Sequence, residues 1–266
     1  MNLLLLEPDE VGGDGTVQLA GARARHLREV LRVRPGDTVR VGLLDGPRGC
    51  AEVLKVDEAS VRLRAMFDTP APPRPTVDLM LAMPRPKALK RLWAPLATAG
   101  VDRIFIVNAE RVPKMYFDSD ALDPALIRSR LIEGLAQAGE TALPQVEVRR
   151  RLKPFVEDEL NEFAGDACRL LALSGDAPRV ADRVLPSRRV WLAVGPEGGW
   201  TPRETAWLCD HGFHCVSMGP RIWRADAAAL ALLALVHDAL RAVTAGPVTS
   251  LLQACLLYTS PSPRDS

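Results

Sequence analysis

Residues 194–204 read Val194-Gly-Pro-Glu-Gly-Gly-Trp-Thr-Pro-Arg-Glu204, and an apolar run from Trp191 to Val194 leads into them. The run predicts a buried strand, and the glycines predict a turn that lets a ligand approach the backbone. Thr201 suits the N-cap of a following helix, Pro202 its first position and Glu204 its third, which together make a capping box. Open α/β sheets bind their ligands at such strand ends. We therefore expect a binding loop here, with a plain strand-to-helix turn as the alternative.

A second loop of the same kind occupies residues 217–227, which read Ser-Met-Gly-Pro-Arg-Ile-Trp-Arg-Ala-Asp-Ala. It again joins a strand end to a helix start through a Gly-Pro turn, so we expect the two loops to line one pocket. Ile222 and Trp223 suit the face of an adenine, and Arg224 and Asp226 supply charge. The alternatives are core packing for the two apolar side chains and a helix-start role for Asp226. Neither loop matches the glycine pattern of a dinucleotide site or a Walker loop.

Around these loops, short apolar runs alternate with helical runs. This alternation predicts an α/β fold with a mainly parallel sheet and helices on both faces. We expect strands at residues 77–83, 104–108, 170–174, 190–194 and 214–218, and helices at 87–99, 123–138, 155–164, 202–211 and 225–241. The last helix is rich in Ala and Leu nearly all round, which predicts full burial, including burial in a dimer interface.

The proline-rich segment Pro70-Ala-Pro-Pro-Arg-Pro75 interrupts this pattern and marks a boundary between two parts of the chain. Before it, residues 38–44, 50–56 and 61–67 alternate in the manner of strands, and residues 22–31 have a helical pattern. The N-terminal part is therefore expected to be a small β-barrel of about 70 residues.

The composition is that of an ordinary globular protein, because 47% of the 266 residues are hydrophobic and 25% are charged. Lys and Arg number 34 against 33 Asp and Glu, so the net charge of +1 excludes a polycation and any nucleic-acid contact must rest on local basic patches. No secretory signal is expected at the start. The most apolar run, residues 227–236, is about half the roughly 20 residues of a membrane span.

The cysteines are five in number and scattered, with no C-x-x-C pair, which predicts reduced thiols in a cytoplasmic protein. Residues 209–215, Cys-Asp-His-Gly-Phe-His-Cys, contain side chains that commonly bind zinc. They span a helix end and a strand start, so we expect their side chains to diverge and predict no metal site.

GPEGGWTPRE at residues 195–204, followed about twenty residues on by MGPRIWR at 218–224, resembles the signature pair of the 16S ribosomal RNA uracil-N3 methyltransferase family. This family belongs to the SPOUT superfamily, and the resemblance spans most of residues 15–242. It implies a PUA-like RNA-binding β-barrel over residues 1–74 and a SPOUT-type parallel sheet with a C-terminal trefoil knot over residues 75–245. The final dozen residues resemble a translated sequencing adapter, so 246–266 is predicted to be a non-native tail.

The family also implies S-adenosylmethionine (SAM) as the cofactor and a homodimer. Its substrate would be a uridine of 16S ribosomal RNA, either as naked RNA or within the small ribosomal subunit. Carried over by position, the cofactor-binding residues are Gly195, Pro196, Glu197, Gly198 and Gly199 on one wall, Met218, Gly219, Pro220, Ile222, Trp223 and Arg224 on the other, and Leu173 at a preceding strand end. The chain departs from the family's usual pattern at Trp223, where leucine is usual, and at Asp226, where glutamate is usual.

Catalysis is assigned to Arg224, Asp226 and Glu197. Uracil N3 must lose its imide proton before it attacks the methyl group. Arg224 is expected to stabilise negative charge on a uracil carbonyl, and Asp226 or Glu197 to accept the proton or hold Arg224 in place. The alternative is that Glu197 and Glu204 only bind backbone amides.

RNA contacts are assigned to two basic runs. They comprise Arg25, Arg28, Arg32 and Arg34 in the PUA-like part and Arg85 and Lys87 at the entrance of the catalytic part. The alternative for both runs is an ordinary solvated surface. Two rival functions stay open, a non-catalytic RNA-binding protein and an α/β enzyme that uses another nucleotide.

Overall fold

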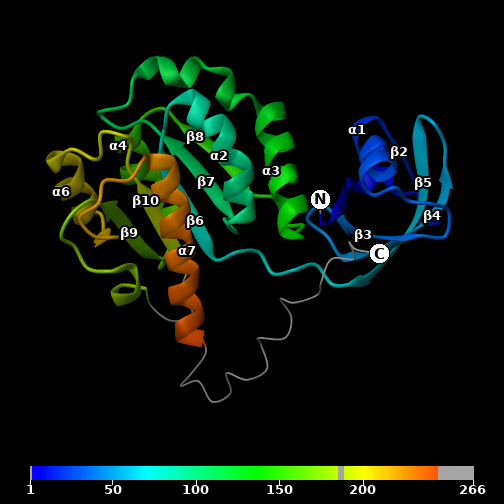
Figure 1. The fold of residues 1–266 in the computed structure, drawn as a ribbon. Coiled ribbons are helices and arrows are strands. Elements are labelled where there is room, and N and C mark those ends of the chain that lie inside the picture. Colours follow the sequence, from blue (N-terminus) through cyan, green and yellow to red (C-terminus); the bar gives the residue numbers. More distant parts are fainter. Residues whose placement is uncertain (1, 185–188, 245–266) are drawn as a thin grey trace.

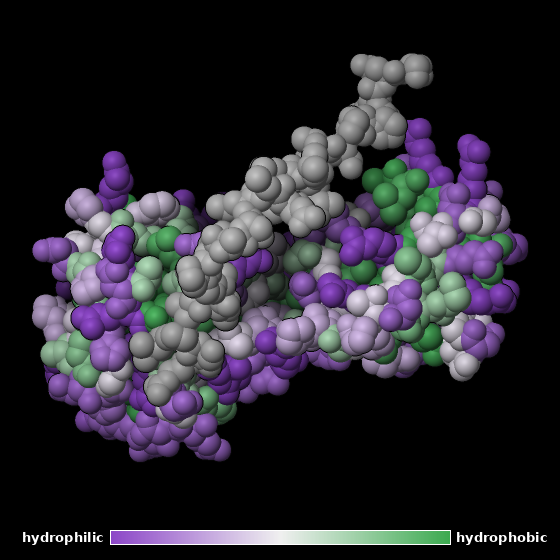
Figure 2. Space-filling view, turned by 90° about the horizontal axis from the view of Figure 1, so that it is seen from below, coloured by the Kyte–Doolittle hydropathy of each residue, from purple (hydrophilic) through white to green (hydrophobic). Residues whose placement is uncertain are grey.

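The computed structural model describes residues 2–184 and 189–244 of the chain. The predicted tail at 246–266 lies outside the described residues. Strands β1 to β5 form a smaller lobe, the elements from β6 to α7 form a larger one, and an extended segment at residues 70–76 connects them (Figure 1). Seen from below, hydrophilic residues cover much of both lobes, and a narrower bridge joins the lobes (Figure 2).

The smaller lobe is a curled five-stranded sheet (Figure 1). Its strands, in the spatial order β1-β3-β4-β5-β2, are β1 Leu4–Leu6, β2 Thr16–Ala20, β3 Thr38–Leu43, β4 Arg48–Val56 and β5 Ser60–Thr69. β1 and β3 are parallel, and the other neighbours are antiparallel. The three predicted strands are confirmed, whereas β1 and β2 were not expected, because the leucine run of β1 has no alternation and β2 is only five residues long.

The predicted helix at 22–31 has two parts, α1 Gly21–Arg25 and a π-helical turn His26–Val30. Leu27 of this helix is buried in the core of the smaller lobe. Val30 and Leu31 of the same segment are 65% and 47% exposed. The apolar side chains of this segment are therefore only partly covered. A short 3-10 turn, Pro8–Glu10, completes this lobe.

The larger lobe contains a six-stranded sheet in which every pair of neighbouring strands is parallel. Its strands, in the order β11-β9-β10-β6-β7-β8, are β6 Val77–Ala82, β7 Arg103–Val107, β8 Gln145–Arg149, β9 Cys168–Leu173, β10 Val190–Val194 and β11 His214–Ser217. All residues of β6 and β10 are buried, so helices cover both faces of the sheet, as predicted. The edge strand β8 was not predicted, because it has few apolar residues.

Helices cover the sheet in two layers (Figure 1). The principal helices are α2 Pro86–Thr98, α3 Pro124–Ala138, α4 Leu152–Pro154, α5 Leu160–Ala164, α6 Pro202–Asp210 and α7 Ala225–Thr244. A π-helical turn, Phe155–Glu159, joins α4 to α5, and 3-10 turns occur at Lys114–Asp118, Asp120–Leu122 and Val180–Asp182. α2 packs against both α3 and α7. Phe155 stacks on Phe105 of β7 at a centroid distance of 5.2 Å, which anchors the segment from α4 to α5 to the sheet.

The prediction of full burial for the last helix is wrong for a single chain. Ala229, Leu232, Leu233 and Val236 of α7 are buried, but Leu235 is 42% exposed. The helix therefore has one covered face and one open face, because the sheet and α2 reach only one side of it. Among the described residues, no helix is long and apolar enough to cross a membrane.

A buried ion network lies where the linker meets the large sheet. Asp78 of β6 is fully buried and accepts hydrogen bonds from Arg103 and Arg189. Arg189 also bonds Asp102, which in turn accepts from Arg74 of the linker at 2.6 Å. Burial alone would raise the pKa of Asp102, but the hydrogen bonds from Arg74 and Arg189 outweigh it and hold that pKa below its usual value.

The two lobes are bonded to each other beside this network. Arg74 contacts Asp45 of the smaller lobe at 3.0 Å. The fully buried Thr141 donates its hydroxyl hydrogen to the Gly46 carbonyl at 2.8 Å, and Arg48 donates to the Gly139 carbonyl at 3.1 Å. The segment after α3 therefore serves as the contact surface for the smaller lobe.

Candidate functional site at the carboxyl edge of the sheet

The candidate site is built by the loops that follow β9, β10 and β11. Because the strands are parallel, these loops leave the same edge of the sheet. β9 lies between β10 and β11 in the sheet. The two glycine-proline loops therefore follow strands that are not direct neighbours, and the loop after β9, residues 174–181, follows the strand between them.

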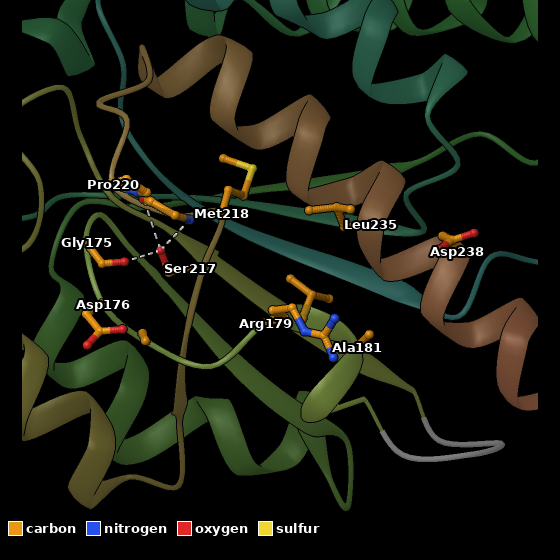
Figure 3. Close-up of a pocket in the computed structure, with 12 residues that line it drawn as sticks. Gly175, Asp176, Arg179, Ala181, Ser217, Met218, Pro220, Leu235 and Asp238 are labelled. Carbon is orange, nitrogen blue, oxygen red and sulfur yellow. Dashed lines mark hydrogen bonds between the residues drawn. The ribbon is translucent and has the colours of Figure 1, made fainter.

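A cavity of about 770 Å³ is associated with this edge (Figure 3). Its lining residues are Gly175, Asp176, Ala177, Arg179, Val180, Ala181, Ser217, Met218, Gly219, Pro220, Leu235 and Asp238. Of the predicted cofactor-binding residues, this lining contains Met218, Gly219 and Pro220 but not Gly198. Pro220 lines this cavity and Gly198 does not.

Apart from Ser217 at the end of β11, the lining residues outside the predicted set come from two places. One is the segment 175–181, which directly follows the strand that ends at Leu173. Its sequence, Gly-Asp-Ala-Pro, is itself a strand-end turn and could have been recognised by that signal. The other is the exposed side of α7, which contributes Leu235 and Asp238. No sequence motif marks these two residues.

Ser217 joins the two loops that line the cavity (Figure 3). Its hydroxyl donates to the Gly175 carbonyl at 2.6 Å, and it accepts the Gly219 backbone N–H at 2.9 Å. The Ser217 backbone N–H donates to the Pro178 carbonyl at 2.9 Å. Gly175 and Gly219 have φ of +101° and +97°, values that L side chains rarely adopt. These glycines therefore allow the two loops to close against each other.

Charged groups lie around an otherwise apolar cavity. Figure 3 shows the carboxylates of Asp176 and Asp238 at opposite ends, with Arg179 between them. Met218 and Leu235 supply apolar surface. Arg179 forms an exposed ion pair with Asp182 at 2.8 Å. The cavity thus offers acids for a cation or for hydroxyl groups, together with an apolar surface for a flat ring.

The glycine-rich loop after β10 has the predicted local structure. Thr201 is the N-cap of α6, Pro202 is its first residue, and the capping box with Glu204 is present. Glu204 also accepts the Glu110 backbone N–H at 2.7 Å, so its role is to bind backbone amides. A Cβ on Gly195 would lie 3.1 Å from the Trp200 ring, so a larger residue there would press on this side chain.

Two neighbouring loops hold this glycine-rich loop in place. Glu197 accepts the backbone N–H of Arg85, at the start of α2, at 3.0 Å. Arg111, which follows β7, donates to the Gly198 carbonyl. The observed contact of Glu197 thus agrees with the alternative stated above, in which this side chain binds a backbone amide. Through these bonds the loop is fixed to the ends of β6 and β7 as well as to β10.

The second predicted loop exposes its distinctive side chains. Ile222 is 90% exposed and Trp223 is 46% exposed, so core packing does not account for either residue in this chain. Arg224 pairs with Asp226 at 2.8 Å. Asp226 lies in the first turn of α7 and also accepts the Ala227 backbone N–H at 3.0 Å. Asp226 therefore both orients Arg224 and binds a backbone N–H in the first turn of the helix.

The predicted RNA-binding residues lie on both lobes. Arg25, Arg32 and Arg34 are exposed on the smaller lobe, and Arg85 and Lys87 are exposed at the start of α2. Arg28 differs, because it is partly buried and donates to the Asp57 carbonyl at 3.2 Å.

The expectation that residues 209–215 diverge is wrong for the two cysteines. The Sγ atoms of Cys209 and Cys215 lie 3.4 Å apart, because the end of α6 folds back onto β11. Burial and the neighbouring thiol raise the pKa of Cys209 to about 11. Nδ1 of His211 is 2.8 Å from the Trp207 carbonyl oxygen. Within 2–184 and 189–244, no three His, Cys, Asp or Glu side chains are grouped as metal ligands.

The fold and the site define a class of protein, a parallel α/β domain with a ligand cavity at the carboxyl ends of its strands. The family model described as an RNA methyltransferase domain matches residues 71–237 of the chain. The chain therefore belongs to this RNA methyltransferase family.

Individual relatives cover most of the chain. Ribosomal RNA small subunit methyltransferase E of Treponema pallidum (strain Nichols) is 28% identical over 241 residues, which are 89% of this chain and 90% of the relative. The protein of the same name from Mycobacterium bovis is 29% identical over 242 residues, which are 89% and 92% of the two chains. The crystal structure of that methyltransferase from Neisseria gonorrhoeae, bound to S-adenosyl methionine, has a TM-score of 0.71 and 24% identity, and the match covers 90% of this chain and 97% of that chain.

Proposed function

We propose that the protein is a SAM-dependent methyltransferase that modifies N3 of a uridine in the 16S RNA of the small ribosomal subunit. The observation that carries the proposal is the cavity between the loops after β9 and β11, in a chain of the RNA methyltransferase family. The relatives' name, ribosomal RNA small subunit methyltransferase E, supports the RNA class, and the SAM in the Neisseria structure supports the cofactor.

The cavity suits SAM in size and in chemistry. Its volume of about 770 Å³ lies within the range of about 300–1,000 Å³ that is usual for small-ligand sites. Asp176 and Asp238 are suited to the ammonium and ribose hydroxyl groups, and Met218 and Leu235 to the adenine. A Cβ on Gly175 or Gly219 would meet no atom within 4 Å, so their backbones are open to a ligand.

The proposed cofactor site includes the predicted residues as well. Met218, Gly219 and Pro220 line the cavity, and Leu173 ends the strand that leads into it. We propose that the glycine-rich loop at residues 195–199 and the segment Ile222 to Arg224 complete the site from either side. The buried Nε1 of Trp200 has no hydrogen-bond partner among the described residues, which supports a ligand or a water beside this loop.

The finer points of the architecture belong to the same proposal. Residues 1–74 are proposed to be a PUA-like β-barrel, and 75–245 a SPOUT domain with a trefoil knot. The curled sheet supports the first assignment. The contact of Ser217 with Pro178 and the bridge between Gly175 and Gly219 support the second, because they require the end of β11 to lie against the segment after β9.

When bound, SAM supplies an electrophilic methyl group, and the side chains of this chain prepare the uracil. Arg224 stabilises the negative charge that develops on a uracil carbonyl as N3 loses its proton. Asp226, 2.8 Å from Arg224, holds the guanidinium in place and is the proposed proton acceptor. Glu197 is the other candidate, and its bond to the Arg85 backbone links the glycine-rich loop to the RNA entrance. A paired uracil hides N3, so the target base must be unpaired or flipped out.

Exposed basic side chains and the open face of α7 indicate the partners that we propose. Arg25, Arg28, Arg32 and Arg34 are proposed to contact RNA from the smaller lobe, and Arg85 and Lys87 beside the site. A second copy of the chain is the proposed cover for the open face of α7, where Leu235 is 42% exposed.

The test is nucleoside mass spectrometry of 16S RNA after unmodified small subunits have been incubated with the protein and SAM. A methylated uridine is the expected product, and Arg224→Ala should abolish it. Arg221→Ala is the matched control, because Arg221 is an exposed arginine of the same loop and has no proposed role. RNA binding without product would favour a non-catalytic binding protein. Stabilisation by NAD or ATP but not by SAM would favour the other rival enzyme.

A further inference from the structure

A second cavity lies near the carboxyl edge of the sheet, beside β7 and α6. Its volume is about 370 Å³, which also lies within the range of about 300–1,000 Å³ for ligand sites. The lining comes from residues 108–114 after β7, residues 152–153 after β8, and the first two turns of α6. None of the residues assigned above to the cofactor, to catalysis or to RNA lies in it.

Three cations line this cavity, and the fold gives little reason for them. Arg203 is the second residue of α6, where the helix dipole disfavours a positive charge. Arg203 and Lys114 are exposed, and neither forms an ion pair with another described residue. Lys153 has only a loose contact with Glu157, at 3.7 Å. Charges that do not stabilise the fold are available for an anionic ligand.

The two carboxylates of the cavity are already bonded to neighbouring groups. Glu204 accepts the backbone N–H groups of Glu110 and Thr201 at 2.7 and 2.8 Å. Glu110 lies 3.1 Å from the Thr201 hydroxyl oxygen. The lining therefore carries three cations against two carboxylates, and both carboxylates are held by neutral groups rather than by the cations.

Two further groups in the lining suit a nucleobase. Oδ1 of Asn108 is buried and has no hydrogen-bond partner among the described residues, so it can accept an N–H group. Trp207 is partly buried and lines the same cavity, which provides an aromatic ring for stacking. Proteins that bind single-stranded RNA combine aromatic stacking, base-edge hydrogen bonds and cations for phosphate. All three groups meet here.

We propose that this cavity binds one unpaired nucleotide of the RNA substrate. Its base contacts Trp207 and donates an N–H group to Asn108, and its phosphate contacts Arg203 and Lys153. The inference rests on the proposed function in that the ligand is the RNA on which the enzyme acts. Arg111 joins the loop after β7 to Gly198, so a nucleotide held here is a neighbour of the target nucleotide rather than the target itself.

The test is fluorescence anisotropy with a labelled single-stranded fragment of 16S RNA at several salt concentrations. Arg203→Ala should lower the slope of log affinity against log salt by about one, as expected for a lost phosphate contact. Trp207→Ala should weaken binding about ten-fold, and Trp207→Phe, which keeps a stacking ring, should stay within about two-fold of wild type. Arg130→Ala is the matched control, because Arg130 lies on α3 and pairs with Glu133 at 2.8 Å.

Two companion measurements separate this inference from folding and from the proposed activity. Trp207 packs partly against the core, so unfolding temperatures check the Trp207 variants, while exposed Arg203 provides the independent test. SAM affinity should be unchanged in all variants. Weaker RNA binding by the variants supports the inference even if the wild-type protein methylates nothing. The lack of methylation would refute only the proposed function.

An unchanged salt slope and affinity for Arg203→Ala would overturn the inference, and so would a wild-type protein that binds no RNA. If the variants lost affinity for assembled subunits but bound the naked fragment like wild type, the occupant would be a ribosomal protein and the inference would be wrong.

Discussion

Replacing Asp78 by Asn tests the buried ion network that lies where the linker meets the large sheet. Asp78 is fully buried and accepts four hydrogen bonds, at 3.0 and 2.6 Å from Arg103 and at 2.6 and 2.7 Å from Arg189. An asparagine keeps the shape but loses the charge, and its amide N–H₂ faces the guanidinium donors. Breaking a buried ion pair costs about 3–5 kcal/mol. Because the side chains of Arg103 and Arg189 are 18% and 30% exposed and can reach water, we expect about 3 kcal/mol.

The assay is thermal unfolding followed by circular dichroism. For a chain of this size, about 3 kcal/mol lowers the unfolding temperature by roughly 6–12 °C. Asp120→Asn is the control, because Asp120 pairs with Lys90 at 2.5 Å but is 77% exposed, and surface pairs contribute little. If Asp78→Asn lowers the unfolding temperature no more than Asp120→Asn does, the network does not stabilise the fold as argued.

Three further predictions concern packing, the glycine-rich loop and pH. Gly134→Ala should lower the free energy of unfolding, measured in denaturant, by about 1–2 kcal/mol. A Cβ would lie 2.1 Å from the Ala94 carbonyl oxygen, and this overpacking outweighs a helix-propensity gain of up to about 1 kcal/mol. Equal stability of the variant and wild type would contradict this. Arg111→Ala frees the Gly198 carbonyl and should weaken SAM binding about five- to ten-fold by calorimetry, whereas unchanged affinity would exclude a role for this contact. Burial lowers the pKa of His237 in the folded protein, so the unfolded chain takes up a proton there more readily. The stability that neutral His237 contributes is therefore present above the ordinary histidine pKa of about 6.5 and is lost as the pH falls below it. The free energy of unfolding should therefore fall less between about pH 7.5 and 5.5 in His237→Gln than in wild type, and an identical fall would refute the assignment.

Local sequence patterns were sufficient for most of the secondary structure. The alternation of apolar and helical runs predicted five of the six strands of the large sheet, because buried parallel strands are continuous apolar runs. Thr201, Pro202 and Glu204 predicted the start of α6, since a capping box depends only on residues within one helical turn. β8 was missed because an edge strand with Gln145 and Glu147 lacks that apolar signal.

The candidate site was predicted only in part. The residues at 218–220 were found because a Gly-Pro turn is visible in the sequence. Asp176, Arg179 and Asp238 were not, because they come from a loop and a helix that approach the cavity only in the folded chain. The contact of Cys209 with Cys215 was likewise missed, since it requires the end of α6 to return to β11.

Taken alone, the amino-acid order established the class of fold, the family resemblance and the two strand-end loops, all of which depend on neighbours along the chain. The folded arrangement decided which loops meet. β9 lies between β10 and β11, and the loop after β9 closes against the loop after β11 through the bridge between Gly175 and Gly219. Strand order has no local signature, because it results from how all the apolar faces of the sheet and helices are buried together.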